Sequence, residues 1–307
     1  MKISIKEKNA EDTSFLYVLD KLPMKIRAFI RNFCEGESYS AINEIRIKKK
    51  ANIYLIADGK TVKSDIYISE NDIDEIFEYL CNHSLYAYAS TIKEGYIPLG
   101  SGIRAGVCGK AIMENGEVVG VNDISSINIR IPQKITNASS YIYSLLKRNN
   151  FTSSILIYSL PGVGKTSILR DLILKLNYDS SLIRFSVIDS RNEIIAPFMN
   201  NLSCDVFSSY PKGLGIELAT RSMTPELIIC DEISNESDAN AIMKAIHSGV
   251  KLIATAHASS INELKSKEIL KELINKHSFD YYIGVARGVG EKRYKFTLDT
   301  SEGIKEL

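Results

Sequence analysis

The chain has 307 residues, 45% of them hydrophobic, so it is long enough to bury two ordinary domain cores. Its 38 lysines and arginines nearly balance 37 aspartates and glutamates, whereas nucleic-acid-binding proteins usually carry a basic excess or stripe, so no nucleic-acid partner is expected. The five cysteines form no C-x-x-C pair, and no apolar run reaches membrane-spanning length. We therefore expect a soluble, cytoplasmic protein that meets a membrane only through partners.

The first half of the chain combines one clear helix with short strand-like segments. Ser69 begins a helical pattern over residues 69–81, with Asp72 three positions later as in a capping box. Residues 96–132 consist of short β-branched runs separated by glycines, and Asn115-Gly116 suits a hairpin turn because both residues tolerate positive φ. The pattern predicts a smaller α+β domain over residues 1–140 that contains an antiparallel sheet.

Strand-like and helical segments alternate in the second half, after a polar, Ser- and Asn-containing stretch that we interpret as the hinge. Predicted strands end at Tyr158, Asp189, Cys230 and Thr255, and predicted helices cover residues 166–176, 213–222, 236–247 and 261–276. Such alternation predicts a mostly parallel sheet covered by helices on both faces, so we expect an α/β domain over residues 141–307.

A phosphate-binding loop is predicted between the first of these strands and the following amphipathic helix. Glycines let successive backbone N–H groups turn toward a phosphate, and the helix dipole adds attraction. Lys165 is expected to reach the β- and γ-phosphates of ATP, and the Thr166 hydroxyl to ligate Mg²⁺. The predicted nucleotide-binding residues are Ser159, Leu160, Pro161, Gly162, Val163, Gly164, Lys165, Thr166 and Ser167. Ser159 occupies the first position of the motif, where glycine is usual.

Two acidic strand ends compete for the role of catalytic base. One apolar strand ends in Asp231 and Glu232, of which Asp231 suits the Mg²⁺ shell and Glu232 suits the orientation and deprotonation of water. The strand that ends at Asp189 is followed by Glu193, which is either a rival base or an acid at a helix start. The residues alone leave this choice open, with a preference for Glu232 because the Asp-Glu pair is complete.

A histidine and several arginines are candidates for sensing or stabilising the γ-phosphate. His257 follows a core strand, where its imidazole is either a sensor or a satisfied structural group. Ring ATPases place an arginine from a neighbouring subunit or domain on the γ-phosphate, where it offsets developing charge. Arg221 and Arg104 are the preferred candidates because they lie in motif-bearing turns or helix ends. The other candidates are Arg130, Arg287 and Arg293, and an ordinary surface arginine is the alternative for each.

Several stretches, in order along both halves, resemble the stage III sporulation protein AA family, which is related to the secretion ATPases of type II and type IV systems. They are HSLYAYASTIKEGYIPLGSGIRAGVCG from His83, DISSINIRIP from Asp123, the phosphate loop, DSRNEI from Asp189, YPKGLG from Tyr210, RSMTPELIICDEI from Arg221 and AIHSGVKLIATAH from Ala245. Three residues depart from the family pattern, namely Ser159, Ser190 and Ala258.

The resemblance implies a carboxy-terminal RecA-like P-loop NTPase domain that hydrolyses ATP with Mg²⁺. It also implies a homo-oligomer, in the form of a hexameric ring, in the mother-cell cytoplasm, associated with membrane channel proteins of a sporulation complex. In the related secretion ATPases the catalytic glutamate belongs to the acidic box, whose counterpart here is Glu193.

The sequence is compatible with three functions. The leading expectation is an ATPase that acts as a motor or assembly factor for a sporulation channel. Ser159 keeps open an ATP-binding switch or scaffold with little hydrolysis. A RecA-like motor on nucleic acid is the third, although the near-zero net charge of +1 is an adverse sign.

Overall fold

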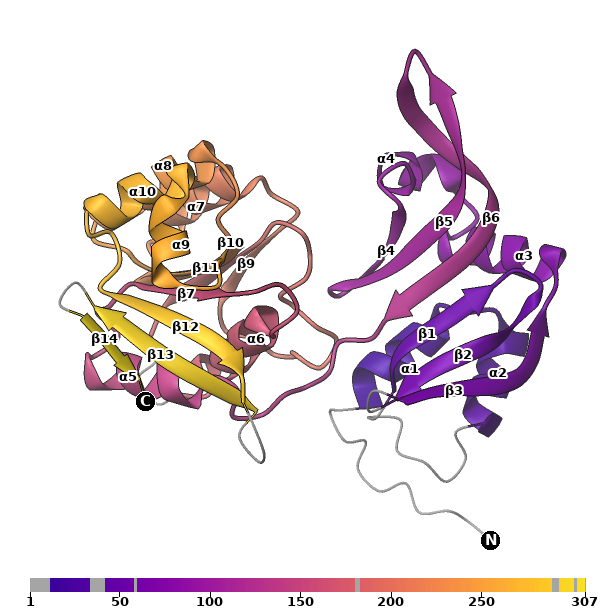
Figure 1. Ribbon diagram of the computed structural model, residues 1–307, viewed down its shortest axis with the longest axis horizontal. Helices are drawn as coiled ribbons and strands as arrows, with labels where there is room; N and C mark the ends of the chain where they lie inside the picture. Colours follow the sequence, from indigo (N-terminus) through magenta and orange to yellow (C-terminus); the bar gives the residue numbers. More distant parts are fainter. Residues whose placement is uncertain are drawn as a thin grey trace, which may run out of the picture. The chain divides into compact units, whose positions relative to one another are not determined.

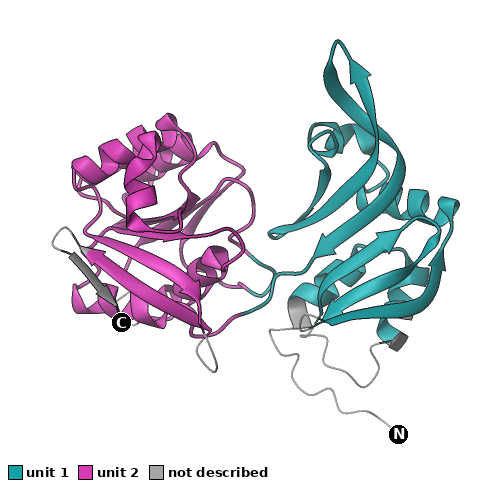
Figure 2. Ribbon diagram, in the orientation of Figure 1, with its two compact units in different colours: residues 1–134, 196–198 teal, residues 135–195, 199–307 magenta. Residues whose placement is uncertain are grey.

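The computed structural model describes residues 12–33, 42–57, 60–179, 183–288, 293–300 and 303–306. The chain forms two compact units, one made of residues 1–134 with 196–198 and the other of residues 135–195 with 199–307 (Figure 2). Each unit is built around its own sheet. No helix in the described part of the chain is long and apolar enough to cross a lipid bilayer.

The first unit contains a six-stranded, antiparallel sheet in the order β3-β2-β1-β6-β5-β4 (Figure 1). Its elements are α1 (Asp12–Asp20), α2 (Met24–Phe33), β1 (Ile42–Lys48), β2 (Ala51–Ala57), β3 (Lys60–Ile68), α3 (Glu70–Leu80), the 3-10 helix η2 (Leu85–Tyr88), α4 (Ala89–Ile92), β4 (Tyr96–Gly100), β5 (Ile103–Glu114) and β6 (Glu117–Arg130). Aliphatic side chains from α1, α2, α3 and the sheet form one buried cluster. The antiparallel sheet expected in this half is confirmed.

Helix α3 begins where the capping box predicts. The Ser69 hydroxyl accepts a hydrogen bond from the Asp72 N–H at 3.2 Å, and the Asp72 carboxylate accepts one from the Ser69 N–H at 2.9 Å. The two side chains thus satisfy backbone groups that a helix start leaves unpaired. The turn between β5 and β6 has Asn115 at φ +50° and Gly116 at φ +83°, as the hairpin signal predicts.

The second unit contains an eight-stranded mixed sheet in the order β14-β13-β12-β7-β11-β10-β8-β9. From β12 through β7, β11, β10 and β8 to β9, each neighbouring pair of strands is parallel. Strands β13 and β14 add antiparallel pairs at one edge, which the sequence pattern did not indicate. Its elements are α5 (Ser140–Arg148), β7 (Ile155–Ser159), α6 (Lys165–Asn177), β8 (Phe185–Asp189), β9 (Asp205–Ser208), α7 (Lys212–Ser222), β10 (Leu227–Glu232), α8 (Glu236–His247), β11 (Lys251–His257), α9 (Ile261–Ser266), α10 (Glu268–Asn275), β12 (Tyr281–Arg287), β13 (Tyr294–Thr300) and β14 (Gly303–Glu306).

The prediction of a single helix over residues 261–276 is wrong, because the chain forms two short helices there. Lys267 separates α9 from α10 in an extended conformation, with φ −76° and ψ 118°. Its ammonium donates a hydrogen bond to the His257 carbonyl at the end of β11. This tertiary contact lies at the break between the two helices. The spacing of apolar residues in the sequence does not indicate such a contact.

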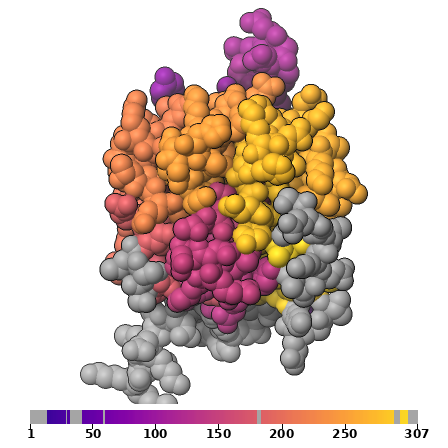
Figure 3. All heavy atoms as spheres, turned by 90° about the vertical axis from the view of Figure 1, so that its left-hand side faces the viewer, coloured from indigo at the N-terminus to yellow at the C-terminus, as the bar shows by residue number. Residues whose placement is uncertain are grey.

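Helices cover both faces of the parallel part of the sheet, which explains why all five residues of β7 are buried. Apolar residues of α7, α8, α9 and α10 share one cluster with alternate residues of the strands, while α5 and α6 lie on the other side (Figure 1). Segments far apart in sequence also meet at the surface of this unit (Figure 3). For example, Asn149, just after α5, donates to the Tyr281 hydroxyl at 3.2 Å.

Candidate functional site

The predicted phosphate loop lies between the end of β7 and the start of α6. Gly162 and Gly164 have φ values of +74° and +123°, a region that favours glycine, so the loop shape depends on both residues. A Cβ on Gly164 would also collide with the Tyr294 hydroxyl, whereas Gly162 faces open space. The loop therefore has the backbone conformation that lets N–H groups turn inward, and its helix presents a positive dipole end.

Lys165 is held at the base of this loop. Its ammonium donates to the Ser159 carbonyl and hydroxyl, both at 3.2 Å, and to His257 Nδ1 at 2.7 Å. The residue is only 8% exposed, and this burial lowers the pKa of Lys165 to about 8, although the nearby Glu232 carboxylate opposes the shift. Ser159, the departure from the motif, thus supplies an oxygen that a glycine would lack.

His257 connects Lys165 to Glu232. Its Nε2 lies 3.0 Å from Glu232 Oε2, while Nδ1 accepts from Lys165. In a neutral imidazole this arrangement puts the proton on Nε2, facing the carboxylate. The strands position the group, because Ser159 pairs with His257 across β7 and β11, and Glu232 pairs with Thr255 across β10 and β11. Three residues predicted separately from sequence are therefore in direct contact.

Asp231 takes part in a buried charge cluster that the sequence reasoning missed. Lys212, which begins α7 and is 8% exposed, lies 2.8 Å from Asp231 Oδ1 and 3.7 Å from Asp238 Oδ2, and it donates to the Glu232 carbonyl. Burial alone would lower the pKa of Lys212, yet the neighbouring acidic groups raise it overall. A signal existed in the sequence, since a cation in the first turn of a helix opposes the dipole and needs an acidic partner.

The acidic residues after β8 have different surroundings. Asp189 is buried and accepts backbone N–H bonds from Glu193 at 2.7 Å, Ile194 at 3.1 Å and Ile195 at 3.0 Å. Burial raises the pKa of Asp189, while these hydrogen bonds oppose the shift. Arg170 of α6 donates to the Glu193 carbonyl at 2.5 Å. Glu193 thus lies in a loop held by Asp189 and Arg170, and no helix begins at this described position, contrary to the helix-start alternative.

Thr166 and Asp231 are the residues near the loop that were predicted to hold a magnesium ion. No group of three or more His, Cys, Asp or Glu side chains in the described ranges is arranged to hold a metal ion. Mg²⁺ usually takes one or two protein ligands together with substrate phosphates and water. Thr166 in the first turn of α6 and Asp231 at the end of β10 are residue types that suit such a shared site.

The predicted arginines belong to different units and elements. Arg221 lies in the last turn of α7, a helix of 11 residues, about 16 Å long at 1.5 Å per residue, whose first residue contacts Asp231. Arg104 belongs to β5 of the first unit, where its guanidinium lies 4.5 Å from the centre of the Tyr96 ring. Arg130 ends β6. Arg287 does approach the loop, since its Nη2 lies 3.5 Å from the Gly162 carbonyl.

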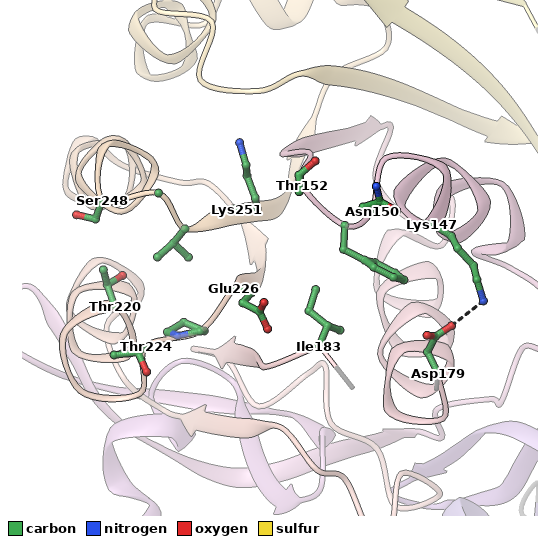
Figure 4. Close-up of a pocket in the computed structure, with 14 residues that line it drawn as sticks. Lys147, Asn150, Thr152, Asp179, Ile183, Thr220, Thr224, Glu226, Ser248 and Lys251 are labelled. Atoms are coloured by element: carbon green, nitrogen blue, oxygen red, sulfur yellow. Dashed lines mark hydrogen bonds and ion pairs between the residues drawn. The ribbon is translucent and has the colours of Figure 1, made fainter. Parts of the chain in front are cut away.

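A cavity of about 820 Å³ lies at the amino-terminal ends of β10 and β11, whereas the loop follows the carboxyl end of β7 (Figure 4). Its lining includes Lys147 and Asp179, which form an ion pair at 3.0 Å, together with Glu226 and Lys251. None of the predicted site residues lines it. This cavity is therefore separate from the loop where the predicted site residues lie.

Comparison with solved structures shows that the fold resembles that of the secretion ATPases DotB and PilT. The ATPase DotB of Legionella pneumophila matches with a TM-score of 0.57 and 18% identity, covering 89% of this chain and 80% of that chain. The pilus retraction motor PilT, solved with bound ADP, matches with a TM-score of 0.61 and 14% identity, covering 92% of this chain and 82% of that chain.

Sequence comparison then defines the family. Residues 17–295 match the family described as sporulation stage III, protein AA. Stage III sporulation protein AA of Bacillus subtilis (strain 168) is 31% identical over 282 residues, covering 89% of this chain and 91% of the relative. The chain therefore belongs to the stage III sporulation protein AA family, as the resemblance indicated.

Proposed function

We propose that the second unit binds ATP with Mg²⁺ at the phosphate loop and hydrolyses its terminal phosphoanhydride bond. The observation that carries this proposal is the continuous contact from Lys165 through His257 to Glu232. It joins a cation suited to phosphates to a carboxylate suited to activating water, at the edge where open α/β sheets bind ligands. The ADP bound to PilT, a motor of the same fold, supports a nucleotide as the ligand.

Lys165 is the residue that we assign to the β- and γ-phosphates. Its pKa of about 8 leaves the ammonium charged at neutral pH. Phosphate oxygens would replace Ser159 and His257 as its partners, and the buried setting strengthens that attraction. His257 then loses its contact with Lys165 when the phosphate is present, which gives it the character of a sensor.

Glu232 is the residue that we assign as general base. His257 Nε2 holds Oε2 of the carboxylate, so we assign Oε1 to the attacking water. The carboxylate takes a proton as the water oxygen bonds to the γ-phosphorus and the bond to the bridging oxygen breaks. Thr166 and Asp231 would hold Mg²⁺, which would supply positive charge beside the phosphate oxygens. Glu193 is the rival base, because it matches the acidic box of the related ATPases.

The cellular role that we propose is that of a motor or assembly ATPase for a sporulation channel in the mother cell. Membership of the sporulation family and the fold shared with DotB and PilT support it. We further propose a RecA-like, hexameric ring in which Arg221 or Arg104 of a neighbouring subunit reaches the γ-phosphate. Such an arginine would offset charge that develops in the transition state.

Steady-state phosphate release from the purified full chain tests hydrolysis. We expect Mg²⁺-dependent release from the wild type and a loss of at least about 100-fold in both Lys165→Ala and Glu232→Gln. A matched control is Lys175→Ala, which changes a lysine of the same helix that contacts Asp171 at 3.4 Å. Equal rates for the wild type and Lys165→Ala would refute the proposal.

A second candidate function is an ATP-binding switch with little turnover. The contact between the Ser159 hydroxyl and Lys165 favours it, because this contact competes with phosphate for the ammonium. ATP that binds to the wild type and is recovered intact after long incubation would support this candidate instead of the motor.

A further inference from the structure

A tyrosine of β13 packs directly on the phosphate loop. The Tyr294 hydroxyl and ring occupy the space where a side chain on Gly164 would lie. Ser167, in the first turn of α6, is a hydrogen-bonding neighbour of the phenol. Burial raises the pKa of Tyr294, so the hydroxyl is neutral at physiological pH and can both donate and accept a hydrogen bond. The contact places an aromatic ring beside two residues of the predicted nucleotide site.

The ring is held in place by other aromatic side chains. Tyr294 and Phe296 lie on one face of β13 with ring centroids 6.3 Å apart, and Phe296 packs on Tyr141 of α5 at 5.5 Å. Aromatic pairs at these separations attract one another beyond their apolar burial. Tyr294 is therefore the last member of a row of packed aromatic rings that ends at the loop.

Two guanidinium groups accompany the ring. Arg287 Nη2 lies 3.5 Å from the Gly162 carbonyl, and the charges of both Arg293 and Arg287 act on the Tyr294 phenol. Arg287 and Arg293 are exposed. The end of β12 and the start of β13 thus bring two exposed positive charges and one packed aromatic ring to the loop.

The geometry points to a nucleoside subsite formed by Tyr294, with Arg287 and Arg293 toward the α-phosphate. Lys165 serves the β- and γ-phosphates, while loop N–H groups cradle the α- and β-phosphates. Ser167, two residues beyond Lys165, consequently lies toward the α-phosphate, and the ring beside it faces the sugar and base. Stacking of a base on an aromatic ring suits this position, and the inference rests on the proposed ATP site.

Two roles of Tyr294, contact with the nucleoside and mere support of the loop, can be distinguished by comparing the binding of ATP with that of inorganic tripolyphosphate, both with Mg²⁺. Calorimetric titration of the full chain should show that Tyr294→Ala weakens ATP about tenfold, equivalent to about 1.4 kcal/mol, and leaves tripolyphosphate within twofold of the wild type. Tyr294→Phe should retain ATP affinity within about threefold because the ring remains. Tyr178→Ala, a change of an exposed tyrosine just after the carboxyl end of α6, should alter neither ligand.

The subsite is refuted if Tyr294→Ala weakens both ligands equally, because the ring then only supports the loop. Unchanged ATP affinity in Tyr294→Ala, or equal losses in the Ala and Phe variants, would refute it as well. These outcomes do not depend on turnover. A wild type that binds ATP tightly without hydrolysing it would contradict the proposed ATPase while leaving the subsite fully tested.

Discussion

Replacing Lys212 by methionine should destabilise the second unit strongly. The side chains of Lys212 and Asp231 are 7% and 15% exposed and form an ion pair at 2.8 Å. Loss of the ammonium would leave Asp231 without its partner and would remove a cation from Asp238. Removal of one member of a buried pair typically costs about 3 to 5 kcal/mol, because the other charge remains desolvated.

The lower end of that range applies here. Asp238 keeps hydrogen bonds from the Ser234 N–H at 3.1 Å and hydroxyl at 3.0 Å, so part of its charge stays compensated. We therefore expect about 3 kcal/mol for Lys212→Met, which corresponds to a fall in melting temperature of about 6 to 12 °C. Thermal unfolding followed by circular dichroism at pH 7 measures this difference directly.

A surface pair on the same layer of helices supplies the matched control. Lys244 and Glu217 also lie 2.8 Å apart, but their side chains are 71% and 47% exposed, so Lys244→Met should cost less than about 1 kcal/mol. Adding Asp231→Asn to Lys212→Met should restore part of the loss, since it removes the uncompensated carboxylate. Equal melting temperatures for Lys212→Met and Lys244→Met would refute the reasoning.

Further predictions concern the loop, the rival bases and a helix cap. Ser159→Gly removes one acceptor of Lys165 and should tighten ATP binding about 2- to 10-fold in a nucleotide titration; weaker binding would contradict this role. Since the pKa of Lys165 is about 8 before ATP binds, affinity should be about tenfold lower at pH 9 than at pH 7, and a flat profile would count against it. The same depressed pKa disfavours folding below pH 8, and that cost should be relieved as pH rises from 8 toward 10.5. Glu193→Gln should keep more phosphate release than Glu232→Gln, and the reverse order would make Glu193 the base. Ser69→Ala should lower the free energy of unfolding by about 1 kcal/mol in thermal melts, and no change would show that the cap is dispensable.

Local signals in the sequence predicted the elements that short-range physics controls. The capping box of Ser69 and Asp72 places the start of α3, and Asn115-Gly116 supplies the positive φ values of the hairpin turn. The proximity of His257 and Glu232 could also be predicted, because both follow parallel strands whose carboxyl ends lie at the same edge of the sheet.

Contacts made by long side chains across the fold were not predictable in the same way. Lys212 reaches Asp231 from the start of another helix, and Lys267 ends α9 while bonding to the carbonyl of His257. Tyr294 contacts Gly164 from a strand about 130 residues later in the chain. That strand pairs antiparallel with β12, so no crossover helix in the sequence indicates its place in the sheet. These positions depend on which strands become neighbours, and sequence periodicity does not specify that order.

Recovery of bound nucleotide from Glu232→Gln tests the central claim most directly. The variant and the wild type would each be mixed with radiolabelled ATP and Mg²⁺, separated from free nucleotide and quenched, and the bound ATP and ADP measured. We predict that Glu232→Gln retains mostly ATP whereas the wild type and Lys175→Ala yield ADP. Equal conversion to ADP in the wild type and Glu232→Gln would contradict the account of hydrolysis at this site.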